Sequence, residues 1–293
     1  MKISDPHLHL FDLVKGEYQW LKPEHPPFWS DKSKINRDFS ELDLTVFEQF
    51  ELSSFVHIEA GFNNEHPSQE VEWLEKTVTK PFKSIATANL LLEPEEFKSQ
   101  ISELKLYYSV AGVRHILDEN AVAILNSANC LGNLSYLESQ NLIFELQTNL
   151  FDILIVNSIT KSLSSLPLGN LKVVINHAGF PPADHNQNED EWANWLAGIK
   201  RLSTFSNVSI KCSGWEMSNR NYTLAAIKLK IKSVINVFGI ERIMMASNFP
   251  LCTFSKSYAE YWQDIVLVLN NLNIPQAHQQ KLLHDNAVAF YFK

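Results

Sequence analysis

Cysteine is scarce in this sequence, and no stretch has the length of a membrane span. The 293 residues include only Cys130, Cys212 and Cys252, and no two of them form a CxxC pair. That odd number argues against a disulfide framework and against a thiolate metal site, and is typical of a reduced cytosolic protein. Residues 1–7 lack the apolar stretch of a signal peptide. The longest purely apolar run, residues 287–292, is far below the ~20 residues of a transmembrane helix. We therefore expect a soluble, cytoplasmic protein.

The sequence also lacks an excess of positive charge. Lys and Arg number 25 against 33 Asp and Glu, which gives a net charge of −8. This balance argues against nucleic acid or an anionic membrane as a partner, so we expect a small molecule, while the oligomeric state is not indicated. Neither the G-x-G-x-x-G fingerprint nor the G-x-x-x-x-G-K-[ST] loop occurs, which disfavours a nucleotide-binding fold.

The sequence does contain short β-branched segments that alternate with longer segments of helical periodicity. Helical spacing is clearest from Trp192 to Leu202 and over residues 65–79. Because parallel strands need crossover connections, this alternation predicts an α/β fold with a parallel sheet. We predict a single (β/α)₈ TIM-type barrel domain over residues 1–293, with an open doubly wound sheet as the alternative. The eight candidate strands are residues 2–9, 52–59, 83–89, 110–115, 141–147, 171–177, 207–213 and 241–248.

A long loop, residues 10–40, follows the first predicted strand and is rich in Trp, Pro and charged residues. Loops of this length in compact domains are usually functional. We expect this loop to fold over the active-site mouth, with Trp20 or Trp29 shielding a pocket from water.

Polar side chains gather at the ends of the predicted strands, where TIM barrels hold their catalytic groups. Because residues i and i+2 of a strand share a face, three pairs are expected to face the barrel mouth. A single such residue is more often structural, as a hydrogen-bonded His or a Glu paired with a base. An apolar core, however, has no need for ionisable groups at nearly every strand end. The pairs are His7/His9, His57/Glu59 and Glu145/Gln147, and other strands end near Arg114, His177, Lys211 and Asn248.

These residues belong to motifs that follow one another along nearly the whole chain. The ordered series resembles the amidohydrolase-related family, in the branch of the amidohydrolase superfamily that contains sugar-acid lactonases and 2-pyrone-4,6-dicarboxylate lactonase. The resemblance implies a (β/α)₈ barrel that hydrolyses a cyclic ester. The motifs are Asp5-x-His7-x-His9-Leu-Phe-Asp12, Val56-His57-Ile-Glu59-Ala60, Gly112-Val-Arg114, Asn176-His177-Ala-Gly179-x-Pro181, Lys211-x-Ser213-Gly214 and Met245-Ala-Ser247-Asn248-Phe-Pro250.

The resemblance also implies roles for individual residues. His7, His9 and His177 would polarise the scissile carbonyl, with or without a divalent metal. Arg114 matches the family's anion-binding arginine. Substrate-binding positions are completed by His57, Gln147, Lys211, Trp20 and Trp29.

The sequence departs from the family pattern at Asn248, where many members have an aspartate. A carboxamide can orient a water molecule but cannot take a proton from it, and it is a weaker metal ligand than a carboxylate. Gln147 likewise stands where metal-binding members often have a histidine. We therefore expect either no required cofactor or one weakly held divalent metal (Zn) on His7, His9 and His177. Glu59, Glu145 and Asp5 are the candidate general bases, with Asn248 positioning the water.

The favoured function is hydrolysis of a small lactone, either of a sugar acid or of a carboxylated ring compound. A non-catalytic small-molecule binding protein on the same barrel is one alternative, since Asn248 is compatible with a lost base. A metal-dependent decarboxylase is the other, and Asn248 speaks against it. The sequence leaves the identity of the substrate open.

Overall fold

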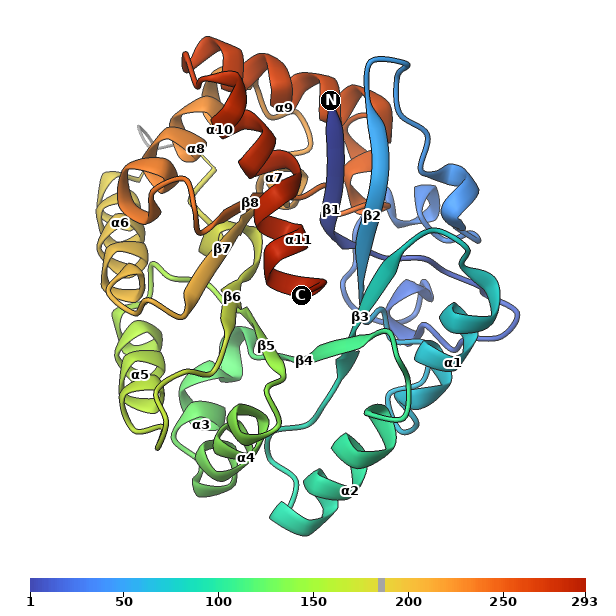
Figure 1. Cartoon of the computed structure of the whole chain (residues 1–293), viewed down its shortest axis with the longest axis vertical. Coiled ribbons are helices and arrows are strands. Elements are labelled where there is room, and N and C mark those ends of the chain that lie inside the picture. The colour runs from blue at the N-terminus through green and yellow to red at the C-terminus, as the bar shows by residue number, and fades with distance from the viewer. Residues whose placement is uncertain (184–187) are drawn as a thin grey trace.

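The computed structural model describes residues 1–183 and 188–293. Its strands form one eight-stranded sheet in chain order, in which every neighbouring pair is parallel. The first and last strands meet where Leu8 bridges Phe249 and the Asn248 N–H donates to the His7 carbonyl at 2.9 Å. The sheet is thus a nearly closed barrel, and the predicted TIM-type fold is confirmed (Figure 1). The strands are β1 (Lys2–Leu8), β2 (Glu51–Ile58), β3 (Phe82–Thr87), β4 (Val110–Ile116), β5 (Ile143–Gln147), β6 (Val173–Ile175), β7 (Val208–Cys212) and β8 (Ile243–Met245).

Helices surround this barrel and connect its strands (Figure 1). None of the helices in the described ranges is long and apolar enough to cross a membrane. The helices are α1 (Ser68–Thr77), α2 (Pro94–Leu104), α3 (Ala121–Leu125), α4 (Ala128–Ser139), α5 (Ile153–Ser164), α6 (Glu189–Ser203), α7 (Trp215–Ser218), α8 (Leu224–Phe238), α9 (Tyr258–Asn271), α10 (Gln276–Gln280) and α11 (Asn286–Tyr291). Single turns are η1 (Gln19–Leu21), η2 (Lys32–Lys34), η3 (Glu41–Asp43), η4 (Asp118–Asn120), η5 (Asn176–Gly179), η6 (Leu251–Phe254) and η7 (Lys281–Asp285).

The helix α6 illustrates how the outer layer packs on the sheet. The side chain of Asn188 accepts a hydrogen bond from the Glu191 N–H, and acidic residues fill the first turn, where they favour the positive end of the helix dipole. Trp195, Ile199 and Leu202 are buried, as the apolar periodicity predicts. This amphipathic face therefore supplies part of the main core between helices and strands.

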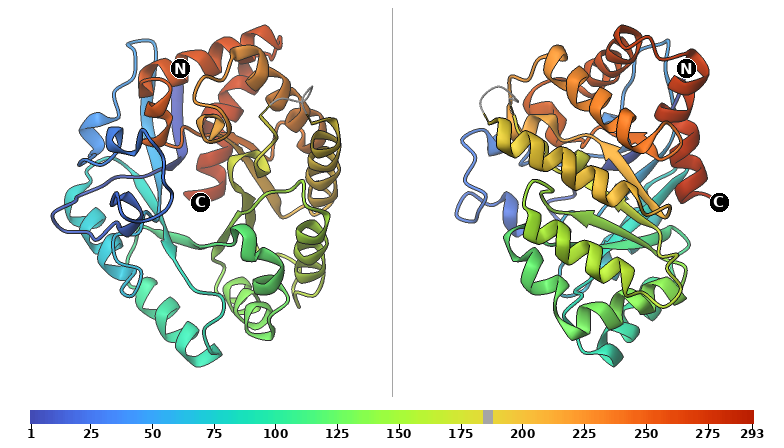
Figure 2. Two further views of the ribbon diagram at one scale, coloured as in Figure 1. Left: turned by 180° about the vertical axis from the view of Figure 1, so that it is seen from behind. Right: turned by 90° about the vertical axis from the view of Figure 1, so that its left-hand side faces the viewer.

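One end of the barrel is closed from inside by the C-terminal segment. Val56, Ile58 and Val174 point into the barrel and form a small apolar cluster with Tyr291 of α11. Figure 1 shows α11 lying over the centre of the barrel. In the side view of Figure 2, the blue 10–40 segment and the red C-terminal helices lie on opposite sides. The end that carries the 10–40 loop is therefore the open mouth, where the strands end.

Candidate active site

Three imidazoles meet at the carboxyl ends of β1 and β6. The ring centroid of His7 lies 4.6 Å from that of His177 and 5.2 Å from that of His9. Burial holds the pKa of each imidazole well below its usual range, and the charge of Arg114 adds to this effect at all three rings. Lys211 further lowers the pKa of His7 and His177. All three rings are therefore neutral at pH 7, so each carries one N–H donor and one acceptor nitrogen.

His7 is the most unusual of the three because its ring is fully buried and makes no hydrogen bond to any described residue. Neither of its ring nitrogens has a partner in the part of the chain that the structure describes. A buried polar group without a partner costs free energy, so native structures keep few of them, often at functional sites. His9 differs, since its Nδ1 donates to the Ile58 carbonyl at 2.8 Å and only Nε2 faces the site.

A tight turn after β7 brings Ser213 against His177. The Ser213 hydroxyl lies 3.0 Å from Nδ1 of His177. At Gly214 the backbone is left-handed, with φ of 73°, and a Cβ there would lie 2.6 Å from the same nitrogen. Both the conformation and the close approach therefore require glycine. The Ser213-Gly214 motif thus sets the orientation of the His177 ring.

Two site residues themselves have strained backbones. His177 has φ of 50° and Asn248 has φ of 60°, in the left-handed region that costs a residue with a Cβ about 1 kcal/mol or more. These turns end β6 and β8 earlier than predicted, at Ile175 and Met245. Backbone strain of this kind gathers at functional sites, and it aims both side chains at the mouth.

Arg114 is held by neighbours on both sides. Its Nε donates to Oε1 of Glu59 at 2.7 Å, and its Nη1 donates to Oε1 of Gln147 at 2.7 Å. Thr87 donates to the other carboxylate oxygen of Glu59 at 3.1 Å. The predicted strand-end residues do meet here, but Arg114 is already neutralised by Glu59, and Gln147 positions its guanidinium.

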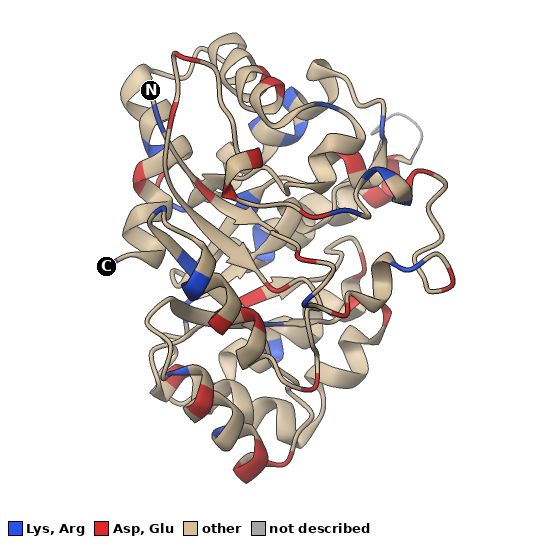
Figure 3. Cartoon of the chain, turned by 90° about the vertical axis from the view of Figure 1, so that its right-hand side faces the viewer, with Lys and Arg blue, Asp and Glu red and all other residues tan. Residues whose placement is uncertain are grey.

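Glu145 and Lys211 form a fully buried ion pair inside the barrel. Nζ of Lys211 lies 2.7 and 2.8 Å from the two carboxylate oxygens. Asn176 and Tyr291 each donate a further hydrogen bond to this carboxylate. Burial lowers the pKa of Lys211 to about 8 against the opposing pull of Glu145. A carboxylate has about four acceptor positions, so this geometry argues against Glu145 as the general base. Figure 3 shows such charged positions on the central strands, where a core is usually apolar.

The expectation that His57 points into the mouth is wrong. On β2 the interior positions are Val56 and Ile58, so alternation turns His57 outward to α1. Its Nε2 lies 2.9 Å from Glu70, and its Nδ1 accepts from the Leu10 N–H at 3.2 Å. Burial lowers the pKa of His57 to about 3 and raises that of Glu70 to about 8. The contact is therefore a hydrogen bond between neutral groups, and it is structural.

Asp5 lies at the seam where the barrel closes. Its carboxyl accepts hydrogen bonds from the Ser247 hydroxyl at 2.5 Å, the Ser247 N–H at 3.1 Å and the Tyr258 hydroxyl at 3.1 Å. Burial raises its pKa to about 6 despite these contacts. Asp5 thus joins β1 to the segment after β8, and its oxygens face those partners.

The 10–40 loop contacts segments that follow three different strands. Trp20 donates its indole N–H to the Ala60 carbonyl at 2.7 Å, after β2. The Trp29 ring lies 5.7 Å from Phe254, after β8, and 5.2 Å from the guanidinium of Arg220, after β7. Arg220 also donates to Asp31 at 3.1 Å. These contacts keep both tryptophans on the mouth side of the barrel.

Sequence reasoning missed Glu216, which is fully buried on the short helix α7. Its Oε1 accepts a hydrogen bond from Nδ2 of Asn248 at 2.6 Å, and its Oε2 has no partner among the described residues. The only sequence signal is a lone carboxylate between Trp215 and Met217, just after the Ser213-Gly214 turn. No motif of the predicted set contained it.

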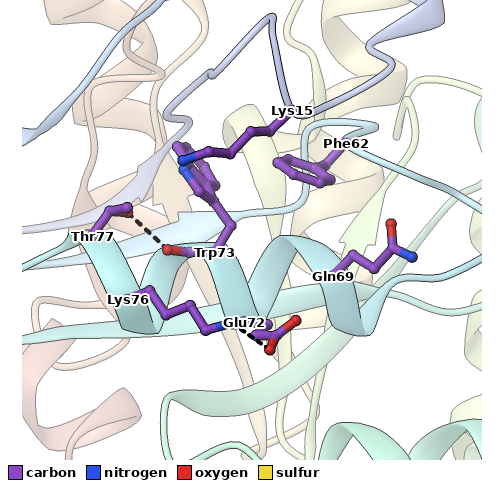
Figure 4. A pocket seen from close by; sticks show the side chains of 7 residues that line it. All are labelled: Lys15, Phe62, Gln69, Glu72, Trp73, Lys76 and Thr77. Atoms are coloured by element: carbon purple, nitrogen blue, oxygen red, sulfur yellow. Dashed lines mark hydrogen bonds and ion pairs between the residues drawn. The ribbon is translucent and has the colours of Figure 1, made fainter.

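Two hollows in the described part of the protein have a volume of about 370 Å³ each, large enough for a small substrate. One lies above His177 and is lined by Phe151, Phe180 and Trp215, among others. The other lies outside the barrel, between Lys15 and α1 (Figure 4). In that hollow Lys76 pairs with Glu72, and no imidazole lines it. The hollow at the mouth, which His177 lines, is therefore the better candidate for the substrate site.

The three imidazoles are the residues that would hold a metal ion at this site. Neutral imidazoles are good zinc ligands, but no group of three or more His, Cys, Asp or Glu side chains within residues 1–183 and 188–293 is arranged to hold one. The Nδ1–H of His9 donates to the Ile58 carbonyl and leaves Nε2 available to a metal, but the strand-8 position carries the neutral Asn248, a weaker ligand than a carboxylate. The described residues thus do not form a fitted zinc site.

Known proteins resemble this chain, two of them over nearly its whole length. A family model described as Amidohydrolase matches residues 4–293. The protein y4mH of Sinorhizobium fredii is 25% identical, over 99% of this chain and 98% of that protein. An L-rhamnono-gamma-lactonase of Scheffersomyces stipitis is 20% identical over 99% and 98% of the two chains. An L-fucono-1,5-lactonase of Burkholderia multivorans is 30% identical, over 30% of this chain and 32% of that enzyme.

Solved structures show the same fold. An amidohydrolase from Burkholderia multivorans with bound HEPES has a TM-score of 0.82 at 17% identity, covering 100% of this chain and 99% of that one. A structure of an amidohydrolase from the same organism with bound zinc has a TM-score of 0.80, at the same identity and coverage. The Pseudomonas putida protein described as a 2-pyrone-4,6-dicarboxylic acid hydrolase has a TM-score of 0.66 at 18% identity, covering 99% and 97%.

Proposed function

The chain belongs to the Amidohydrolase family, and on this premise we propose that it is an enzyme that hydrolyses a small lactone. The observation that carries the proposal is the cluster of His7, His9 and His177, with both ring nitrogens of His7 unpaired among the described residues. The neutral imidazoles of His7 and His177 would donate N–H groups to the oxyanion that forms as water adds to the lactone carbonyl, while His9, whose N–H is donated to Ile58, packs against them. The lactonases among the relatives support this class of reaction.

Within this class we propose an uncharged sugar-acid lactone rather than a carboxylated ring. Arg114 pairs with Glu59 and Lys211 with Glu145, so the predicted anion-binding Arg114 and the predicted substrate-binding Lys211 are both neutralised by buried carboxylates. A dicarboxylate would have to displace one of these buried partners, which costs several kcal/mol. A sugar lactone needs only hydrogen bonds.

The arrangement of the site residues also bears on whether turnover needs a metal. Since the described residues do not form a fitted zinc site, we propose that turnover needs no tightly bound metal. The zinc in one related structure makes this a point to measure. The three cysteines are buried free thiols, which supports the prediction of a reducing, cytoplasmic location.

The test is a panel of lactones assayed by acid release, with and without chelator, alongside the metal content of the purified protein. We expect hydrolysis of L-fucono-1,5-lactone or L-rhamnono-1,4-lactone, insensitive to chelator, and no turnover of 2-pyrone-4,6-dicarboxylate. Binding of sugar lactones without hydrolysis would instead indicate the non-catalytic alternative. Decarboxylation of a benzoate that needs added metal would contradict the proposal outright.

A further inference from the structure

Glu216 is a buried carboxylate at the mouth that forms no ion pair among the described residues. Its side chain is fully buried, and only its Oε1 has a partner, Nδ2 of Asn248 at 2.6 Å. The other oxygen, Oε2, is buried without a hydrogen bond in the described part of the protein. An unpaired carboxylate oxygen in a dry site carries a large free-energy cost. Such a group is retained where a ligand or a water molecule uses it.

Asn248 connects this carboxylate to the imidazole cluster. Its backbone N–H donates to the His7 carbonyl at 2.9 Å, and its side chain contacts His9, where the contact raises the His9 pKa against the larger effect of burial. The flanking residues of Glu216, Trp215 and Met217, line the hollow above His177. Glu216 is therefore adjacent in the chain to the wall of that hollow and is connected to the histidines through Asn248.

The other buried carboxylates near the mouth are engaged. Glu59 is paired with Arg114, Glu145 is paired with Lys211, and Asp5 accepts from Ser247 and Tyr258. Glu70 accepts from His57 and the Ala60 N–H on the α1 side of β2. Among the described carboxylates at the mouth, Glu216 thus combines full burial with an oxygen that has no partner.

The electrostatic setting of Glu216 suits proton transfer near neutral pH. Burial raises its pKa to about 7, against the hydrogen bond from Asn248 and the charge of Arg220. Tyr222, Tyr261 and Cys252 also interact with it, and the pKa of each is raised by burial, so they are uncharged at pH 7. A base whose pKa lies near the working pH is the most effective.

We propose that Glu216 is the general base of the proposed lactone hydrolysis and that Asn248 fixes its carboxylate in place. This inference rests on the proposed function. The Glu216 carboxylate takes a proton from water as the water oxygen bonds to the lactone carbonyl carbon. The tetrahedral intermediate then breaks its bond to the ring oxygen, and Glu216 returns the proton to that oxygen, which yields the hydroxy acid. Residue 248 has no carboxylate, and Glu216 of α7, which is hydrogen-bonded to Asn248, thus provides one in its place.

The sharpest test exchanges the two partners. Glu216→Gln keeps an acceptor for Asn248 but removes the base, so kcat should fall 10²–10⁴-fold and the rise of kcat/KM with pH near 7 should disappear. Asn248→Asp alone sets two carboxyls 2.6 Å apart and should also lower activity at pH 7. The double variant Glu216→Gln/Asn248→Asp restores one carboxylate and one amide across the same hydrogen bond, and should recover at least tenfold over Glu216→Gln.

Controls separate this inference from the proposed function. Glu138→Gln alters another buried carboxyl, one that accepts backbone N–H groups of residues 168, 170 and 171 far from the mouth, and should keep wild-type turnover. The Tm of every variant reports folding. If Glu216→Gln keeps wild-type turnover and pH profile while His7→Ala loses activity, Glu216 is not the base and the lactonase proposal stands. If the wild type hydrolyses none of the lactones, both proposals are overturned.

Discussion

Nζ of Lys211 contacts both carboxylate oxygens of Glu145, at 2.7 and 2.8 Å, and both side chains are fully buried. A charge pair in this position holds β5 against β7 through the barrel interior. Tyr291 donates to the same carboxylate from α11, so the closed end of the barrel is joined to the pair. The ion pair therefore stabilises the barrel. It also occupies the Glu145 carboxylate, which is then not available to take a proton in the reaction.

The first prediction follows from this pair. Lys211→Met leaves the Glu145 charge buried and unpaired, and should lower the free energy of unfolding by about 3–5 kcal/mol. The double variant Lys211→Met/Glu145→Gln removes the charge as well and should be more stable than Lys211→Met. Urea unfolding of the three proteins measures both effects. A double variant that is less stable than Lys211→Met would show that the carboxylate contributes without its partner.

The second prediction contrasts two buried histidines. His7→Ala removes an oxyanion donor and should lower kcat about 10²–10³-fold. It should lower stability less than His57→Ala does, because both changes leave a cavity but the His7 ring makes no hydrogen bond to any described residue. His57→Ala removes the partner of Glu70 and Leu10, and should lower the free energy of unfolding by about 2–4 kcal/mol. Steady-state kinetics and urea unfolding of both variants measure these effects. If His57→Ala lost activity and His7→Ala lost mainly stability, His57 would be the catalytic residue and His7 the structural one.

The contrast also shows what could be predicted from the sequence. The barrel was predictable because eight β-branched segments alternate with helical ones, and their order alone sets a parallel sheet. The strand-end histidines His7 and His177 were predictable because polar residues interrupt apolar strands. The side that His57 faces was not predictable, because it depends on which β2 positions the barrel interior takes, and Val56 and Ile58 take them.

Glu216 was not predictable for a different reason. Its importance depends on a contact with Asn248, 32 residues later in the chain, and on the burial of a short helix that has no periodic pattern. The left-handed backbone at His177 and Asn248 is likewise fixed by tertiary contacts, so the predicted strands 171–177 and 241–248 extend too far.

A third prediction concerns pH and stability. The folded-state pKa of Glu70 is raised from 4.5 to about 8, so between these values the folded protein holds a proton that the unfolded chain releases. The free energy of unfolding contributed by this group therefore falls as pH rises from about 4.5 to 8. Glu70→Gln keeps an acceptor for His57 and the Ala60 N–H without titrating. As pH rises across that window, the free energy of unfolding of Glu70→Gln should increase relative to that of the wild type by up to about 1.4 kcal/mol per pH unit.

The comparison cancels other groups that titrate in the same range. Asp5, whose pKa is raised to about 6, and Glu216 are present in both proteins, so the difference between the two unfolding curves isolates Glu70. Urea unfolding of both proteins at several pH values from 5 to 8 measures this difference. A difference that does not change with pH would mean that Glu70 titrates normally in the folded protein.

The last prediction concerns the loop over the mouth. Trp29 lies among three groups: Trp20 on the same loop at 6.3 Å, Phe254 at 5.7 Å and the Arg220 guanidinium at 5.2 Å. Aromatic and cation–π contacts of this kind contribute about 0.5–1.5 kcal/mol each. Trp29→Ala should therefore loosen the loop, speed amide exchange around η2 and raise KM about five- to tenfold. Because a looser loop also admits water to the oxyanion site, kcat should fall as well. Val14→Ala is the matched control, since Val14 lies on the same loop and is 91% exposed. If Trp29→Ala leaves exchange, KM and kcat at the values of Val14→Ala, the loop does not shield the site, and exclusion of water must come from the walls of the hollow above His177.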